Sequence, residues 1–250
     1  MSSPPCTVAR MHAPKAGHAS DEYEDAAAVA ADAWPVRAAV ADGATESAFA
    51  RRWAEQVAHG AVADAIATPE ALHKALPAWR AAWQAEVDAR ADALPWYAAA
   101  KAADGAFATL LTCTLHADGT WHALSIGDCG LFQVRSGEAV IAWPLAEADA
   151  FHNRPDLLSS RPTSDTSGAP DTPPVQTPPV QTQTGTWTPG DAFVLATDAV
   201  AAWLLRTGPD AALTLTPDAF ADAVASARAS GTLRNDDATL VRLHLAPSSP

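Results

Sequence analysis

Short apolar runs bounded by turn residues predict several β-strands in this chain. Residues 26–31 (AAAVAA) and 36–41 (VRAAVA) are separated by Asp32-Ala33-Trp34-Pro35, a turn-forming sequence. Residues 192–197 (AFVLAT) form a compact apolar run, and residues 238–245 (ATLVRLHL) alternate between apolar and polar positions. We therefore expect one hairpin early in the chain and two further strands late in it.

More strand patterns fill residues 106–145. Turn sequences ADGT and SGE join them, which favours a run of antiparallel hairpins. His116 and His122 flank the first turn, with a midpoint at residue 119, and could face each other. A two-histidine metal site is one interpretation, but a catalytic zinc site ordinarily has three protein ligands, so surface histidines are favoured. The strand segments are 106–116, 121–128, 129–135 and 139–145.

Apolar residues at helical spacing predict helices on both sides of this region. Residues 46–64 place Phe49, Trp53 and Val57 four positions apart, with Thr45 available as an N-cap. A second stripe follows, which Pro77 should kink or restart. We expect both stripes to face the core rather than a cofactor. The second stripe consists of Leu72, Leu76, Trp79, Trp83 and Val87.

Acidic residues stand where the strands meet loops. Asp25 precedes the first strand of the early hairpin and Asp42 follows the second, at equal distances from the turn. They are therefore expected to be cross-strand neighbours, with Cβ atoms roughly 5 Å apart. Two unpaired carboxylates that close repel each other, and such a pair normally shares a proton or binds a cation.

A second acidic pair follows the same logic. Asp198 ends the strand at 192–197, and Asp236 stands just before the strand at 238–245. Predicted helices at 199–206 and 217–229 separate the two strands, a spacing that lets them return side by side. If the strands are adjacent and antiparallel, the two acids meet at one sheet edge. The alternative is that each is an ordinary turn residue, a common use of Asp.

Composition narrows the class of protein. The 250 residues suit a single domain, 1–250, and 48% are apolar, but no run approaches the roughly 20 apolar residues of a membrane span. A net charge of −13 argues against nucleic acid or an anionic membrane as partner. The first residues lack a hydrophobic signal segment, so we expect a cytoplasmic protein. Cys6, Cys113 and Cys129 are expected to be reduced thiols.

Residues 159–188 have a different composition. This Pro/Thr/Gln-rich segment repeats PPVQT and carries almost no large apolar side chain. Such a segment cannot pack a core, so we expect a flexible insertion within the domain.

Taken together, the acidic segments resemble the metal-dependent protein phosphatases, the type 2C serine/threonine phosphatases. The resemblance covers about residues 15 to 245, with the motifs in the family's order. Any one motif is weak, whereas all of them together are fairly specific. They are YEDA (23–26), VADGATES (40–47), IGDCGLFQVRSG (126–137), VLATDAV (194–200) and RNDDATL (234–240).

The resemblance implies an α+β fold: a four-layer αββα sandwich, in which two packed antiparallel β-sheets are flanked by antiparallel helix pairs. It also implies two or three Mn²⁺ or Mg²⁺ ions at one sheet edge, which suits a site made of carboxylates and carbonyls. By resemblance, Asp42 bridges two ions, and a third, weaker ion lies at Asp128, for which a turn-capping role is the alternative. The other implied ligands are Glu24 (through water), Asp25, the Gly43 carbonyl, Asp198 and Asp236.

Several positions depart from the family pattern. The family usually has an arginine for substrate phosphate four residues before the acid pair, and Ser20 stands there. Lys15 could replace it, although a solvated surface lysine is the favoured interpretation. The small residues and His that usually follow the Asp-Gly are replaced by 44–46 (ATE), and Ala199 and Asp237 replace the customary Gly and Asn. Substrate identity is therefore less certain than metal binding.

The expected function is hydrolysis of phosphoserine or phosphothreonine in a protein partner by a water that bridges two divalent metals. The expected catalytic residues are Asp42 and Asp25. The partner would be a phosphoprotein made by a serine/threonine kinase, with no nucleic acid or membrane involved. The residue 159–188 insertion would act as a flap beside the site. The alternatives are an inactive phosphatase-like binding module and a small-phosphoester hydrolase.

Overall fold

The computed structural model describes residues 6–44, 49–90, 104–151, 154–162 and 178–246. Two five-stranded antiparallel sheets form its centre. The first sheet contains, in spatial order, β1 (Cys6–Ala13), β12 (Ala238–Leu245), β11 (Ala192–Ala196), β7 (Gly130–Arg135) and β8 (Glu138–Trp143). The second contains β10 (Gln181–Thr186), β6 (Thr120–Ile126), β5 (Leu110–Leu115), β3 (Val36–Ala41) and β2 (Ala26–Ala30).

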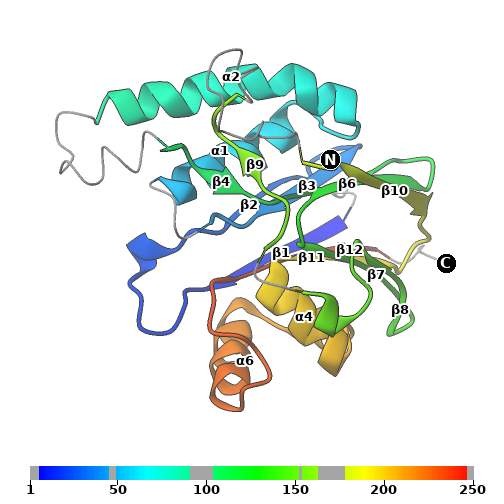
Figure 1. Cartoon of the computed structure of the whole chain (residues 1–250). Helices are drawn as coiled ribbons and strands as arrows, with labels where there is room; N and C mark the ends of the chain where they lie inside the picture. The colour runs from blue at the N-terminus through cyan, green and yellow to red at the C-terminus, as the bar shows by residue number, and fades with distance from the viewer. Residues whose placement is uncertain (1–5, 45–48, 91–103, 152–153, 163–177, 247–250) are drawn as a thin grey trace.

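Helices cover the outer face of each sheet. Figure 1 shows α1 (Ala50–Ala63) and α2 (Pro69–Asp88) over the second sheet, and α4 (Asp198–Thr207) and α6 (Pro217–Ala229) over the first. Short elements complete the described chain: β4 (Phe107–Ala108) pairs with β9 (Leu158–Ser159), and η1 (Ser20–Glu22), η3 (Ala148–Ala150) and α5 (Ala211–Thr214) lie in loops. The predicted α+β sandwich of two sheets between helical layers is confirmed.

The core forms in the three spaces between these layers, because each strand and helix presents apolar side chains to its neighbours. Trp53 and Trp83, on α1 and α2, pack edge to face with ring centroids 6.5 Å apart against the second sheet. Trp121 and Phe193 meet between the sheets, with centroids 5.7 Å apart. Phe220 is buried beneath α6 against the first sheet.

The strand pairing at both acidic ends follows the prediction. In the early hairpin Ala26 pairs with Ala41, so positions equidistant from the turn are opposite each other. Late in the chain β11 and β12 pair antiparallel, with Ala196 opposite Leu240. The two predicted strand pairs are confirmed, one in each sheet.

Some expectations differ from the structure. Strands β6 and β7 do not form a hairpin, because the chain crosses between the sheets at the turn that contains Asp128. Helix α1 begins at Ala50, and Thr45 lies outside the described residues. Helix α2 continues through Pro77 without a restart, and its five stripe residues are buried as expected.

Residues 159–188 contain more regular structure than their composition predicts. Ser159 belongs to β9, and Gln181–Thr186 form β10, an edge strand paired with β6. The stretch 163–177 lies outside the described residues. The composition rule failed at β10 because an edge strand gains its hydrogen bonds from a neighbour and needs few apolar side chains of its own.

Candidate metal centre

The first acidic pair lies at the open end of the β2–β3 hairpin. Asp25 immediately precedes β2 and Asp42 immediately follows β3, one step beyond the paired residues Ala26 and Ala41. Thr109 anchors Asp42 through its backbone: the Asp42 N–H donates to Thr109 Oγ1 at 2.9 Å, and the Thr109 N–H donates to Asp42 O at 2.9 Å. The hairpin therefore brings both carboxylates to one sheet edge.

Asp25 is buried and held by hydroxyl groups from the other sheet. Thr197 Oγ1 and Thr239 Oγ1 donate to Asp25 Oδ2 at 2.9 and 2.7 Å. The Tyr23 hydroxyl contacts Thr239 Oγ1. The remaining oxygen, Asp25 Oδ1, is buried and has no hydrogen-bond partner among the described residues. Burial above all, with added repulsion from Asp237 and Asp198, raises the pKa of Asp25 to about 8 against the two hydrogen bonds.

The pKa of Asp42 depends on the charges of several other aspartates. Burial raises the pKa of its carboxyl well above the ordinary value, and the charges on Asp25, Asp198, Asp236 and Asp128 raise it further, in that order. We call these five residues the acidic cluster. Carboxylates from both sheets therefore converge on one region, as the strand ends predicted.

Asp198 and Asp236 are joined by an arginine. Asp198 is the first residue of α4, just after β11, and Asp236 lies in the loop before β12. Arg234 Nη2 donates to Asp198 Oδ2 and lies 2.9 Å from Asp236 Oδ2. Burial raises the pKa of Asp198, and the Arg234 charge opposes that rise. The sequence analysis missed Arg234, although it belongs to the quoted motif RNDDATL.

Asp128 lies at the crossover between the sheets. Gly127, with φ of 92°, makes the turn between β6 and β7, and Asp128 follows it. Among the described residues, the two buried carboxylate oxygens of Asp128 have no hydrogen-bond partner in another residue. Burial, and then repulsion from Asp198, raises the pKa of Asp128 to about 7. A hydrogen bond with the backbone of Asp128 itself opposes this rise, so the metal-ligand and turn-capping interpretations both stay predictions.

Gly43 lies against the backbone of the first acidic motif. A Cβ atom at position 43 would be 2.8 Å from Glu24 O and 3.1 Å from Ala50 O. Only glycine tolerates so close an approach. This close contact places Glu24 and Gly43 next to each other beside the acidic cluster. Both were predicted to be metal ligands there.

Asp237 has a structural role that the sequence analysis did not assign. Its Oδ1 accepts the backbone N–H of Lys15 at 2.8 Å, and its Oδ2 accepts the backbone N–H of Glu24 at 2.7 Å. Lys15 Nζ is 4.0 Å from Asp236 Oδ1, so this predicted phosphate ligand faces the acidic cluster. Ser20 is exposed in η1. Asp237 thus ties the early acidic motif to the last one.

The donor set of the acidic cluster fits a hard divalent cation. The raised pKa values of Asp25 and Asp128, with buried oxygens that lack a partner among the described residues, mark carboxyl groups whose ionised form the protein itself does not stabilise. Such oxygen ligands suit Mn²⁺ or Mg²⁺. In the described part of the chain, no three His, Cys, Asp or Glu side chains lie close enough together to hold one ion jointly. Asp198 and Asp236 contact Arg234 instead.

Other candidate groups do not match the chemistry of the cluster. His116 and His122 lie with ring centroids 5.2 Å apart, without a third ligand of the His, Cys, Asp or Glu type among the described residues. Cys6, Cys113 and Cys129 are free and buried, and burial raises the pKa of each thiol, which opposes a nucleophilic role.

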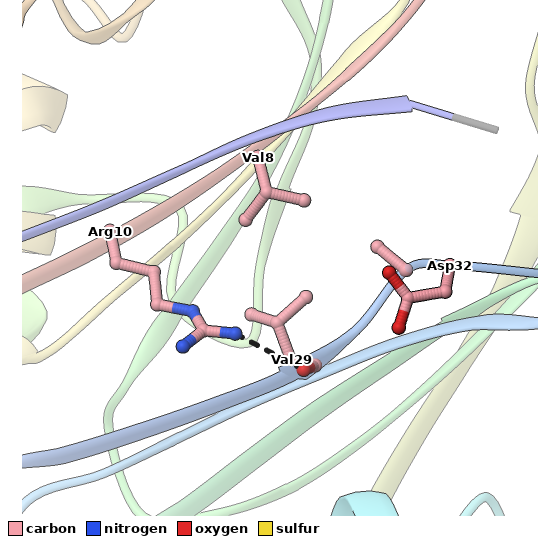
Figure 2. Close-up of a pocket in the computed structure, with 5 residues that line it drawn as sticks. Val8, Arg10, Val29 and Asp32 are labelled. Carbon is pink, nitrogen blue, oxygen red and sulfur yellow. Dashed lines mark hydrogen bonds between the residues drawn. The ribbon is translucent and has the colours of Figure 1, made fainter. Parts of the chain in front are cut away.

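A hollow of about 440 Å³ lies between edge strands β1 and β2 (Figure 2). Arg10 reaches across it and donates from Nη2 to Val29 O at 3.1 Å. Val8, Ala31 and Asp32 complete its lining, and none of these belongs to the acidic cluster.

Among the described residues no helix is both long and apolar enough to cross a membrane.

Solved structures with the same architecture include serine/threonine phosphatases. One is that of the Mycobacterium tuberculosis serine/threonine phosphatase PstP/Ppp, with a TM-score of 0.63 and 17% identity, over 96% of this chain and 99% of that one. Another is the catalytic domain of PstP in complex with two manganese ions, with a TM-score of 0.62 and 17% identity, over 98% and 100%. A third is the phosphatase of *S. agalactiae*, with a TM-score of 0.62 and 13% identity, over 96% and 99%.

At these identities the solved structures establish the fold, and the family rests on a separate comparison. No curated protein matches this sequence. The family model described as protein phosphatase 2C matches residues 14–239, which include the whole acidic cluster. The chain therefore belongs to the protein phosphatase 2C family.

Proposed function

We propose that this protein hydrolyses phosphoserine or phosphothreonine in a protein partner and uses Mn²⁺ or Mg²⁺ held by the acidic cluster. The observation that carries the proposal is the set of buried, unpartnered carboxylate oxygens on Asp25 and Asp128 within a phosphatase 2C fold. The two manganese ions in the PstP structure support a metal-dependent reaction.

The residues that would hold the metals come from both sheets. Asp42 and Asp25 would contribute from the early hairpin, together with the Gly43 carbonyl and, through water, Glu24. Asp198 and Asp236 would contribute from the first sheet, and Asp128 would hold a weaker third ion. When bound, such ions neutralise phosphate charge and lower the pKa of a water so that it can act as the nucleophile.

The chain's own residues prepare this site. Thr197 and Thr239 orient Asp25 and keep its Oδ1 available, while Asp237 holds the backbones of Lys15 and Glu24 beside the cluster. The Lys15 side chain offers one positive charge to an incoming phosphate. We place the reaction in the cytoplasm, on a phosphoprotein that a serine/threonine kinase produces, without nucleic acid or membrane as partner.

Hydrolysis of p-nitrophenyl phosphate with Mn²⁺, and again after chelation, tests the proposal. We expect metal-dependent turnover in the wild type. Asp42→Ala should lower kcat/KM more than about a hundredfold, because even outer-shell partners of metal ligands cost roughly 10- to 100-fold. Asp32→Ala, an exposed aspartate in the turn between β2 and β3, is the matched control and should keep wild-type activity. Equal activity in the wild type and Asp42→Ala would refute the proposal.

A binding module without turnover is the second candidate. It is favoured by Ser20 at the position of the family's phosphate arginine and by the pairing of Asp198 and Asp236 with Arg234. Binding of phosphopeptides without metal-dependent turnover would support it. A small-phosphoester hydrolase would instead turn over p-nitrophenyl phosphate and discriminate poorly among phosphopeptides.

A further inference from the structure

Two arginines line a cavity along α4: Arg234, beside Asp198 at the start of the helix, and Arg206, in its last turn. A small cavity of about 80 Å³ is lined there by Arg206, Arg234 and Asp198. This volume is far below the roughly 300–1,000 Å³ of a typical ligand pocket, so the cavity suits a small ion or group. The remaining lining residues are Ala148, Phe151, Ala199 and Ala202. We call it the α4 cavity.

One face of helix α4 forms a wall of the α4 cavity. Ala199, Ala202 and Arg206 are spaced three and four residues apart on α4 and therefore share one helix face. Phe151 follows η3, which packs against α4. Small alanine side chains leave room between the helix and η3. Arg206 Nη2 is 3.6 Å from Oδ1 of Asp149, whose side chain is exposed. Such an exposed ion pair is weak, so Arg206 can turn to another anion.

Arg234 forms ion pairs with two proposed metal ligands. Its guanidinium contacts Asp198 and Asp236, which are both proposed metal ligands. A divalent cation on these carboxylates would compete for the charge that now holds Arg234. The guanidinium would then lie in the α4 cavity close to the metal cations. An anion bound there would be attracted by both positive charges. Its planar fork of donors matches a phosphate group in two parallel hydrogen bonds, which a lysine cannot copy.

We propose that Arg234, assisted by Arg206, binds the phosphate group of the substrate, in place of the arginine that the family has at the position of Ser20. This inference rests on the proposed function, because it assigns the phosphate contact of the same reaction. Ser20 is exposed and has no charge to offer, and Lys15 Nζ is 4.0 Å from Asp236 and presents a single point charge. Arg234 instead reaches both metal-binding acids of the first sheet and lines a cavity.

Titration calorimetry on the Mn²⁺-saturated protein, with inorganic phosphate as the probe, tests the inference without relying on turnover. Arg234→Ala should weaken phosphate binding about tenfold or more, the effect of losing charged hydrogen bonds. Its Mn²⁺ affinity, measured separately, should stay the same or increase, because a competing cation has been removed. Arg206→Ala should weaken phosphate binding about threefold, as expected for an exposed charge. Arg52→Ala, an exposed arginine on α1, is the matched control and should bind phosphate as the wild type does.

Three results would overturn the inference: unchanged phosphate affinity in Arg234→Ala, loss of Mn²⁺ binding in that variant, or a larger loss of phosphate affinity in Lys15→Ala. Should Arg234→Ala not fold, Arg234→Lys serves instead, because lysine keeps the charge but lacks the planar pair of donors. Wild-type phosphate affinity in Arg234→Lys would also overturn the inference. The proposed function can fail separately. A wild type that binds phosphate through Arg234 but shows no metal-dependent turnover would support this subsite and refute the enzyme.

Discussion

Thr197 and Thr239 determine which oxygen of Asp25 can reach a metal ion. Both hydroxyls donate to Oδ2, from residues that lie on the other sheet, and Oδ1 remains without a partner. Hydrogen bonds from outer residues fix the orientation of a ligand and tune its affinity for metal. The threonines therefore act on the proposed metal site through Asp25, as positioning residues rather than as ligands.

We predict that Thr239→Val weakens Mn²⁺ binding about tenfold, because valine keeps the shape but removes a hydrogen bond to the carboxylate. Thr239→Ser, which keeps the hydroxyl, should stay close to the wild type. Calorimetric titration of each purified variant with Mn²⁺ provides the measurement. If Thr239→Val bound Mn²⁺ as tightly as Thr239→Ser, the positioning role would be wrong.

At the scale of elements, β10 shows that part of the proline-rich segment belongs to the sandwich. Gly185 lies on Trp121, so that a Cβ there would be 2.7 Å from the indole ring. Gln133 Nε2 donates to Thr186 O at 2.9 Å, and Trp187 stacks on Trp34 with ring centroids 5.2 Å apart. The strand therefore covers a fully buried tryptophan and closes one edge of the second sheet.

A deletion series separates the segment from the strand. Removal of residues 164–177, which ends before β10, should leave turnover of p-nitrophenyl phosphate nearly intact, because it touches none of the proposed ligands. Removal of 164–184 also takes part of β10 and should lower the melting temperature, since it removes four of the six residues that pair with β6. Activity assays and thermal melts on both variants test this. Loss of activity in a folded, metal-loaded 164–177 deletion would contradict the prediction.

For the whole molecule, the acidic cluster works against folding when no metal is bound. The pKa of Asp25 is about 8 in the folded protein, against an ordinary value of 3.8. Between these two values the folded state binds more protons than the unfolded chain. The contribution of Asp25 to stability is therefore present at low pH and is lost as the pH rises through this window. The proposed metal would reverse the balance, because it would favour the ionised carboxylate.

We predict that Asp25→Asn melts higher than the wild type after chelation, by an amount that grows between about pH 5.5 and about pH 8. Mn²⁺ at roughly 100 times its dissociation constant should raise the melting temperature of the wild type by roughly 5 to 10 °C and that of Asp25→Asn by less. Scanning calorimetry with chelator or Mn²⁺ provides both readings. A difference between the two proteins that is independent of pH would show that Asp25 is not the buried acid described here.

The agreement between sequence and structure is uneven, for physical reasons. The hairpin register and the β11–β12 pairing could be predicted, because apolar runs, turn residues and chain symmetry act locally. The β6–β7 crossover could not be, since a turn that changes sheets looks the same in sequence as one that forms a hairpin. Strand β10 was missed because its hydrogen bonds come from a partner far away in the chain.

The sequence by itself determined where the acids stand, at the ends of strands, and which family they resemble. Only the tertiary structure decided how the two acidic pairs meet, because the contact depends on how two separately formed sheets pack. Packing also distinguished Asp237, which ties Lys15 and Glu24 together, from its neighbour Asp236, which faces Arg234. Adjacent aspartates have the same chemistry in a sequence, and only the surrounding chain gives each a different partner.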